Sequence, residues 1–312
     1  MNIFATVLTN VAPSANYRGE SEENRTIIQK VTQGRFEYAI ISPEAIRNAL
    51  RETLRLYGLP CNRTRLDNED QLAVSFIEYP CAEKYADDFF FGYLLAMKDA
   101  DRKKFETVRG KGYPIKRDSV IRMNLAKALE PYRHDTVFTQ SPLTVKTEGM
   151  PFQNATTSAL LLRETTVTAF QYPFAINLND CKTDNPTNKE WLLKLLQAIS
   201  ELNDVSGNHA RSYFEMAPAS IVLRLTNSLV AGYDTYGFKS DGSLPEIVDG
   251  ILAGDYPGNE FYLGGKMIRE ILSAETRKAL EDKGASTFRT AQQAINAVTK
   301  DPKVCGVGFL KQ

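Results

Sequence analysis

The sequence predicts an α+β protein in which helices cover one face of a sheet. In the first part of the chain, two stretches rich in β-branched and aromatic residues are followed by an amphipathic helix pattern. In the second half, a strand pattern is again followed by a helix pattern and then by another strand. The order strand, strand, helix, long insertion, strand, helix, strand is typical of a sheet with helices packed on one side.

The N-terminal strands are predicted over residues 3–11 and 35–42, where β-branched, apolar and aromatic residues gather. The polar stretch between them, residues 13–23, is expected to be a loop. A helix begins after Ser42, because this hydroxyl can cap free N–H groups. The helix is expected to end at Gly58.

The C-terminal half contains further strand patterns at 166–178, 219–226 and 304–310. Thr187–Glu190 has the spacing of a capping box and predicts the start of a helix that ends before Gly207. Two later helical patterns span about 266–282 and 287–299.

Two long excursions interrupt this order. Residues 61–115 mix short helical patterns with basic residues, and residues 135–165 are poor in periodicity but rich in Thr, Ser, Pro and Gln. Long excursions in compact domains are usually functional or disordered. Because no linker, repeat or low-complexity tract divides the chain, we expect residues 1–312 to form one domain with insertions.

The charge distribution is uneven although the total balances. The sequence has 38 basic and 38 acidic residues. Between Arg102 and Arg122, however, eight basic residues face only Glu106 and Asp118. A phosphate backbone requires a local positive surface rather than a positive total, so this stretch favours a nucleic-acid partner.

Compartment signals predict a cytoplasmic protein. The N-terminus lacks the features of a signal peptide, and no apolar run approaches the roughly 20 residues that span a bilayer. The four cysteines are not spaced as a zinc site and are expected to be unpaired thiols. We therefore expect neither a metal nor another cofactor.

Three arginines on the helix after Ser42 are candidates for phosphate contacts. Arg47, Arg51 and Arg55 recur every four residues, which places them on one helix face beside the apolar stripe. Planar guanidinium groups at this spacing match successive phosphates. The alternative is a solvated face in which Glu44 pairs with Arg47 and Glu52 with Arg55.

Two polar loops offer further donors. Residues 14–19, with Asn24 and Arg25 just after them, form one, which is otherwise an ordinary surface loop. Residues 207–211 form the other, in which backbone N–H groups and Arg211 could bind phosphate. His209 is a possible general base, but without a nucleophile motif a structural histidine is the simpler interpretation.

Motifs for catalysis are missing from the sequence. The acidic pairs and clusters at Asp87–Asp88 and at 67–70 are expected to be solvated, since neighbouring carboxylates on one helix point apart. We find no dinucleotide fingerprint, Walker loop or nucleophile elbow. The sequence therefore favours a binding protein over an enzyme.

Several blocks, in order, resemble the DevR-type backbone subunits of type I-B CRISPR Cascade, which are members of the RAMP superfamily. The blocks lie at 23–26, 33–38, 42–54, 91–97, 117–119, 126–131, 163–164, 170–178, 207–212 and 220–225. The resemblance runs from residue 1 to about residue 228 and is less clear over 229–300.

The resemblance implies a hand-shaped protein with a ferredoxin-like (RRM-like) palm. A helical finger region would correspond to 61–115 and a β-hairpin thumb to 135–165. Copies of such a subunit stack along a CRISPR RNA (crRNA) beside other Cascade subunits, and the guide pairs with the target DNA strand. In cleaving relatives an acidic loop residue cuts RNA, but here only Glu148 lies well inside the thumb segment, so cleavage is not supported.

The combined prediction is an RNA-binding structural subunit that takes part in antiviral defence. The candidate RNA-binding residues are Asn16, Arg18, Arg25, Ser42, Arg47, Arg51, Arg55, Lys111, Lys116, Arg117, Arg122, Arg163, His209 and Arg211. The alternative is a metal-dependent ribonuclease of related fold, which a chelator test on bound RNA would separate. A DNA-binding regulator is a third hypothesis, although no helix-turn-helix pattern favours it.

Overall fold

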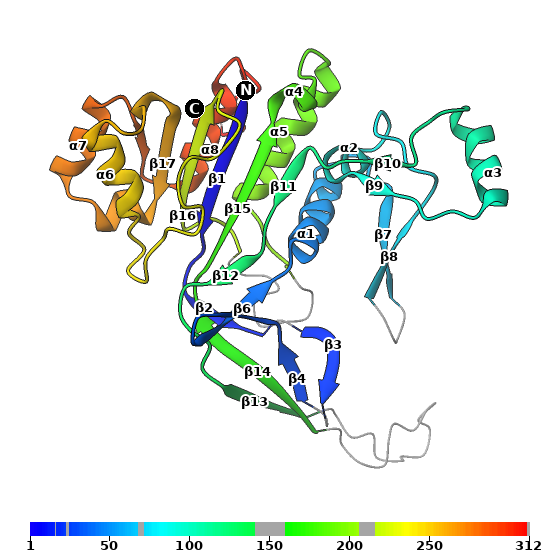
Figure 1. Cartoon of the computed structure of the whole chain (residues 1–312), viewed down its shortest axis with the longest axis horizontal. Helices are drawn as coiled ribbons and strands as arrows, with labels where there is room; N and C mark the ends of the chain where they lie inside the picture. The colour runs from blue at the N-terminus through cyan, green and yellow to red at the C-terminus, as the bar shows by residue number, and fades with distance from the viewer. Residues whose placement is uncertain (16, 23–24, 68–71, 141–159, 206–215, 311–312) are drawn as a thin grey trace, which may run out of the picture.

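A nine-stranded mixed sheet crosses the middle of the computed structural model, which describes residues 1–15, 17–22, 25–67, 72–140, 160–205 and 216–310 (Figure 1). Its strands are β1 (Asn2–Leu8), β5 (Lys30–Gln33), β6 (Phe36–Ile41), β11 (Ile121–Met123), β12 (Ala126–Ala128), β15 (Phe170–Asn177), β16 (Ser220–Thr226), β17 (Phe261–Gly265) and β18 (Ser286–Phe288). The order is β18-β17-β16-β1-β15-β12-β6-β5, with β11 also paired to β15. Only the β17–β18 pair of this sheet is parallel.

The main core lies between one face of this sheet and three helices. These are α1 (Pro43–Leu56), α5 (Pro186–Ser200) and α8 (Ala291–Lys300). Buried side chains such as Leu50, Leu195 and Ile295 pack with Ile3 and Ile176 of the sheet. The predicted α+β class is confirmed.

Part of the opposite face is also covered, which the prediction of helices on one face did not include. A second apolar cluster joins the sheet to α6 (Pro245–Ala253) and α7 (Ala274–Asp282). It contains Val222 of β16, whose sequence neighbours Ile221 and Leu223 belong to the main core. Every residue of β16 is consequently buried.

The cap of α1 is confirmed. The hydroxyl of Ser42 accepts a hydrogen bond of 3.2 Å from the N–H of Ala45, and Pro43 occupies the first turn. Gly58 follows the helix with a φ of 81°, a left-handed conformation that suits glycine.

Two other predicted elements are wrong, and a predicted helix begins slightly earlier than expected. The stretch 13–23 is not all loop, because β2 (Ala12–Ser14) and β3 (Tyr17–Glu22) pair with neighbouring strands. Helix α5 begins earlier than the predicted capping box, since the side chain of Asn185 accepts from the N–H of Thr187. No strand forms over 304–310, where the chain makes turns instead.

The helical pattern at 266–282 is divided into two helices. A π-helix, η2 (Met267–Ile271), precedes α7, and Ser273 caps α7. The segment before them contains a short 3-10 helix, η1 (Gly258–Glu260), and β17, neither of which the sequence prediction included.

Smaller units extend from the central sheet. A five-stranded sheet contains β2, β3, β4 (Arg25–Ile28), β13 (Asp135–Gln140) and β14 (Leu160–Thr168), and lies at the foot of the view in Figure 1. The predicted excursion 135–165 thus contains an antiparallel β13–β14 pair. Its residues 141–159 lie outside the described ranges.

The excursion 61–115 contains one strand pair, a further strand and two helices. The elements are β7 (Arg63–Asp67), β8 (Leu72–Phe76), α2 (Ala86–Phe91), β9 (Tyr93–Leu94) and α3 (Asp99–Arg109), and β9 pairs with β10 (Lys116–Arg117) just beyond it. Helix α4 (Leu178–Cys181) follows β15. Within the described ranges, no helix has the length and apolar character that a membrane span requires.

Candidate nucleic-acid interface

A basic cavity of about 580 Å³ opens where α1 meets the strands of the 61–115 excursion. We call it the basic cavity and define it by its lining residues. They are Glu44, Arg47, Asn48, Arg51, Arg63, Val74, Phe76, Phe91, Gly92, Tyr93, Leu94, Lys116, Arg117, Asp118 and Ser119. Five cations and two carboxylates thus surround one depression, a composition suited to an anionic ligand.

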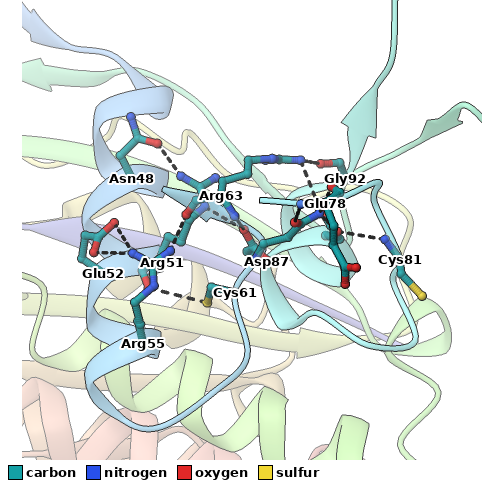
Figure 2. Close-up of polar contacts among 12 residues, drawn as sticks. Asn48, Arg51, Glu52, Arg55, Cys61, Arg63, Glu78, Cys81, Asp87 and Gly92 are labelled. Carbon is teal, nitrogen blue, oxygen red and sulfur yellow. Dashed lines mark hydrogen bonds and ion pairs between the residues drawn. The ribbon is translucent and has the colours of Figure 1, made fainter. Parts of the chain in front are cut away.

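Two arginines of the wall are held by buried carboxylates (Figure 2). The Nε of Arg51 donates to Asp87 at 3.1 Å, and its Nη1 donates to Asn48 at 2.5 Å. The Nη2 of Arg63 lies 3.6 Å from Asp88. Burial lowers the pKa of both guanidinium groups, with their mutual repulsion adding to the shift in Arg51. These arginines therefore form part of the structure of the wall.

The prediction that Asp87 and Asp88 are solvated is wrong, because both are fully buried. Asp87 accepts from the N–H groups of Asn62 at 2.7 Å and Arg63 at 3.1 Å. Asp88 accepts from the side chain of Asn62 at 2.8 Å and the N–H of Cys81 at 3.0 Å. Burial, with repulsion from Asp87, raises the pKa of Asp88.

Arg47 and Arg117 differ from the two wall arginines. The Nε atom of each is buried and has no hydrogen-bond partner in the described part of the chain. Arg117 also lies over the ring of Phe89, with 5.2 Å between the guanidinium carbon and the ring centroid. Unpaired donors of this kind are costly unless a ligand or water meets them. Arg47 and Arg117 share this feature with Arg109 and Arg277, but they alone of the four line the basic cavity, whose composition suits an anionic ligand.

Gly92 permits the close approach that brings Arg117 into the cavity. Its φ is 64°, and a Cβ atom there would lie 2.3 Å from the carbonyl oxygen of Arg117. Only glycine fits this contact without moving β10. The residue thus fixes how closely β9 and β10 approach each other.

A second cavity of about 300 Å³ continues the basic surface. It shares Arg117, Asp118 and Ser119 with the basic cavity and adds the cations Arg122 and Lys182 and the carboxylate of Asp180. The carboxylate of Asp118 lies 3.9 Å from Lys116. Cations from α1, β10 and β11 are therefore brought along one continuous surface.

The structure separates the three arginines of α1. Arg51 is only 4% exposed and is paired with Asp87, an environment that neither the predicted phosphate contacts nor the alternative of a solvated face included. Arg55 pairs with Glu52 at 2.8 Å, as the alternative interpretation of this helix predicts, and also donates to the carbonyl of Arg63. Arg47 lines the cavity without the predicted Glu44 pair being formed among the described contacts.

The other candidate residues are distributed more widely. Lys116, Arg117 and Arg122 join Arg47 at the two cavities. Lys111 is exposed in the turn after α3, while Arg18, Arg25 and Arg163 lie in β3, β4 and β14 of the second sheet. Asn16, Glu148, His209 and Arg211 lie outside the described residues. Their predicted roles stay predictions.

Sequence reasoning missed Arg63 and its two carboxylates. Arg63 follows no periodic pattern, and the Asp87–Asp88 pair resembles an exposed helix start. A usable signal was the run Phe89–Phe91 directly after the pair, because three aromatic residues place this short helix in the core. No group of three His, Cys, Asp or Glu side chains suited to a metal occurs among the residues described.

Comparison with known proteins identifies the family. No family model matches the sequence. A protein of Myxococcus xanthus (strain DK1622), described as CRISPR-associated protein Cas7/Cst2/DevR, is 30% identical over 316 residues, covering 96% of this chain and 97% of its own length.

Solved structures show the same fold. A chain of a "CRISPR RNA-guided surveillance complex, pre-nicking" matches with a TM-score of 0.61 at 11% identity, covering 96% of this chain and 99% of its own. A chain of a "CRISPR RNA-guided surveillance complex" matches with a TM-score of 0.54 at 12% identity, covering 96% and 98%. The 30% identity to the Myxococcus protein, which extends over nearly the whole of both chains, shows that this chain belongs to the Cas7/Cst2/DevR family of CRISPR-associated proteins.

Proposed function

We propose that this chain is the crRNA-binding backbone subunit of a type I-B CRISPR Cascade complex. Its family membership and its fold, shared with chains of RNA-guided surveillance complexes, support this role. In this function the subunit binds guide RNA by shape and phosphate, and base pairing of the guide identifies the target DNA. The subunit acts by binding, without turnover, in the cytoplasm.

The observation that carries the proposal is the pair of unpartnered arginine donors in the basic cavity. Arg51 and Arg63 are neutralised by Asp87 and Asp88, whereas Arg47 and Arg117 retain buried Nε donors without partners in the part of the chain described. Phosphate oxygens accept strongly from guanidinium groups. We assign one phosphate contact to Arg47 and one to Arg117.

The central strands support a ferredoxin-like palm. In chain order, the four central strands are β1, β12, β15 and β16, and in the sheet they are arranged as β16-β1-β15-β12. The fourth strand thus lies on one side of the first strand and the third strand on its other side. This is the 4-1-3-2 order of a ferredoxin-like sheet. Helix α1 lies between β1 and β12 in sequence, and α5 lies between β15 and β16. In this proposal the 61–115 excursion is the finger region, and 135–165 is the thumb.

Assembly follows from the same proposal. Several copies of the chain stack along one crRNA and contact other Cascade subunits. Residues 1–312 form a single hand-shaped domain, in which the palm carries the basic cavity and the finger region supplies its outer wall through β7, β8 and β9.

The test is the salt dependence of RNA binding by the double variant Arg47→Ala/Arg117→Ala. Each phosphate contact on a single strand contributes about 0.7 to the slope of log K against log salt. We expect weaker binding and a slope reduced by roughly 1.4 for the two contacts. Fluorescence anisotropy of a labelled single-stranded RNA over a salt series measures both.

Arg277→Ala is the matched control. Its Nε is likewise buried and unpartnered among the described atoms, but it lies in α7, outside the lining of both cavities. We expect the control to keep the wild-type slope. A double variant that folds and also keeps the wild-type slope would contradict the assignment of Arg47 and Arg117.

A further inference from the structure

Three neighbouring strands present an arginine, an alanine and a phenylalanine on the face of the sheet opposite α1 and α5. In the strand register Arg122 of β11 lies opposite Ala175 of β15, and Ala175 lies opposite Phe4 of β1. The residues beside them in sequence, such as Ile3, Ile121 and Ile176, belong to the main core. Since side chains alternate along a strand, Arg122, Ala175 and Phe4 share the other face.

The small alanine leaves a slot between its two larger neighbours. A cavity of about 280 Å³ lies here, lined by Phe4, Arg122, Met123, Asn124, Pro173, Phe174, Ala175 and Thr235. Adjacent strands are about 4.8 Å apart, so the Cβ atoms of Phe4 and Arg122 lie roughly 10 Å apart across β15. A flat ring stacked between two groups needs about 7 Å, twice the usual carbon contact distance.

Both sides of the slot are groups that stack on flat aromatic rings. A phenylalanine ring and a guanidinium plane both stack on the face of a nucleobase, and such stacking accepts any base. Because Ala175 and Pro173 form the floor, the slot favours a planar apolar face over a charged group.

Charge beside the slot indicates what the ring is attached to. Arg122 also lines the second cavity, together with Arg117 and Lys182. A base in the slot therefore has cations available for its phosphate in the neighbouring cavity. This combination of stacking groups and cations fits a nucleotide of a single strand rather than an isolated aromatic molecule.

We propose that the slot formed by Phe4, Ala175 and Arg122 is a binding site for one unstacked nucleobase of the bound single-stranded RNA. The proposal rests on the proposed RNA-binding function and adds a base contact to the phosphate contacts of Arg47 and Arg117.

The experiment is photocrosslinking of the full chain to single-stranded RNA that carries 4-thiouridine, followed by mass spectrometry that locates the crosslinked residue. We expect crosslinks at Phe4 or at the slot residues 122–124 and 173–175. Phe4→Leu keeps an apolar side chain but removes the ring, and we expect roughly a tenfold loss of crosslinks at the slot. Crosslinks at other positions should keep their yield.

Two further variants test whether the loss of crosslinks comes from the slot itself. Ala175→Leu fills the slot without touching Phe4 or Arg122 and should abolish the same crosslinks. Phe309→Leu removes another partly buried ring, which packs against the main core, and should leave them unchanged.

Bound wild-type RNA that gives no crosslink at the slot overturns the proposal, as do Phe4→Leu and Ala175→Leu proteins that crosslink there like the wild type. Failure of the proposed RNA-binding function can be distinguished from failure of the slot proposal, because the wild-type chain would then not bind the RNA in anisotropy measurements.

Discussion

At the scale of single residues, two arginines one helical turn apart have different environments. The spacing of Arg47 and Arg51 correctly predicts that both extend from α1, and both line the basic cavity. The sequence could not predict that Asp87, 36 residues further along, is hydrogen-bonded to Arg51. Periodicity describes the face of one helix, whereas the partner comes from an insertion with no pattern of its own.

Removing Asp87 tests the strength of this buried pair. Asp87→Ala leaves the guanidinium of Arg51 buried without its carboxylate, and we expect the free energy of unfolding to fall by about 3–5 kcal/mol. Glu52→Ala removes the partner of Arg55, a partly exposed pair, and should cost less than about 1 kcal/mol. Urea unfolding measures both, and equal losses would contradict the distinction between the two pairs.

At the scale of elements, the sequence predicts best where a local signal determines the outcome. The Ser42 cap and the strands around residues 3, 36 and 220 have such signals and are confirmed. The segment 13–23 has no apolar alternation, and its strands form because β4 and β14 provide pairing partners. The covered outer side of β16 could not be predicted either, since it depends on α6 and α7 packing from far along the chain.

Glu164 of β14 connects several elements and predicts a pH dependence. Its carboxylate accepts from the N–H of Ile28 at 3.0 Å, lies 3.3 Å from Lys30 and 3.8 Å from His134, and is almost fully buried. Burial alone would raise the pKa of Glu164, but the Ile28 and Lys30 contacts outweigh it and lower the pKa.

A lowered pKa means that the folded state prefers the ionised carboxylate. The contribution to stability is therefore present above the unfolded pKa of about 4.3 and is lost as pH falls through the lower folded value. We expect Glu164→Gln to be less stable than the wild type at neutral pH, with the difference shrinking below pH ~4. Urea midpoints over this range provide the measurement, and a difference that stays constant would argue against it.

At the scale of the whole molecule, the ordered sequence blocks predict the family, which the Myxococcus relative confirms. They could not reveal the basic cavity, because its wall combines α1 with strands from an excursion that has no periodicity. The boundaries of finger and thumb stay predictions, as do the roles of Asn16, His209 and Arg211.

The thumb assignment predicts a separation between folding and assembly. Gln140 and Leu160 are paired at the ends of β13 and β14, so a short Gly-Ser turn can replace residues 141–159. The replaced stretch contains Leu143, Val145, Met150 and Phe152, apolar residues that suit contacts with bases or neighbouring subunits. We expect the variant to fold but to form shorter filaments on guide RNA, as counted by native mass spectrometry. Filaments of wild-type stoichiometry would refute the assignment.

The place of β1 in the sheet also affects how the protein is made on the ribosome. This first strand lies between β15 and β16, so Asn2 pairs with Asn177 and with Thr226. At about 5–20 residues per second, its partners emerge roughly 9–45 s after it does. Until then an apolar N-terminal strand is without its sheet, and nascent chains are expected to rely on chaperones that shield such segments during translation.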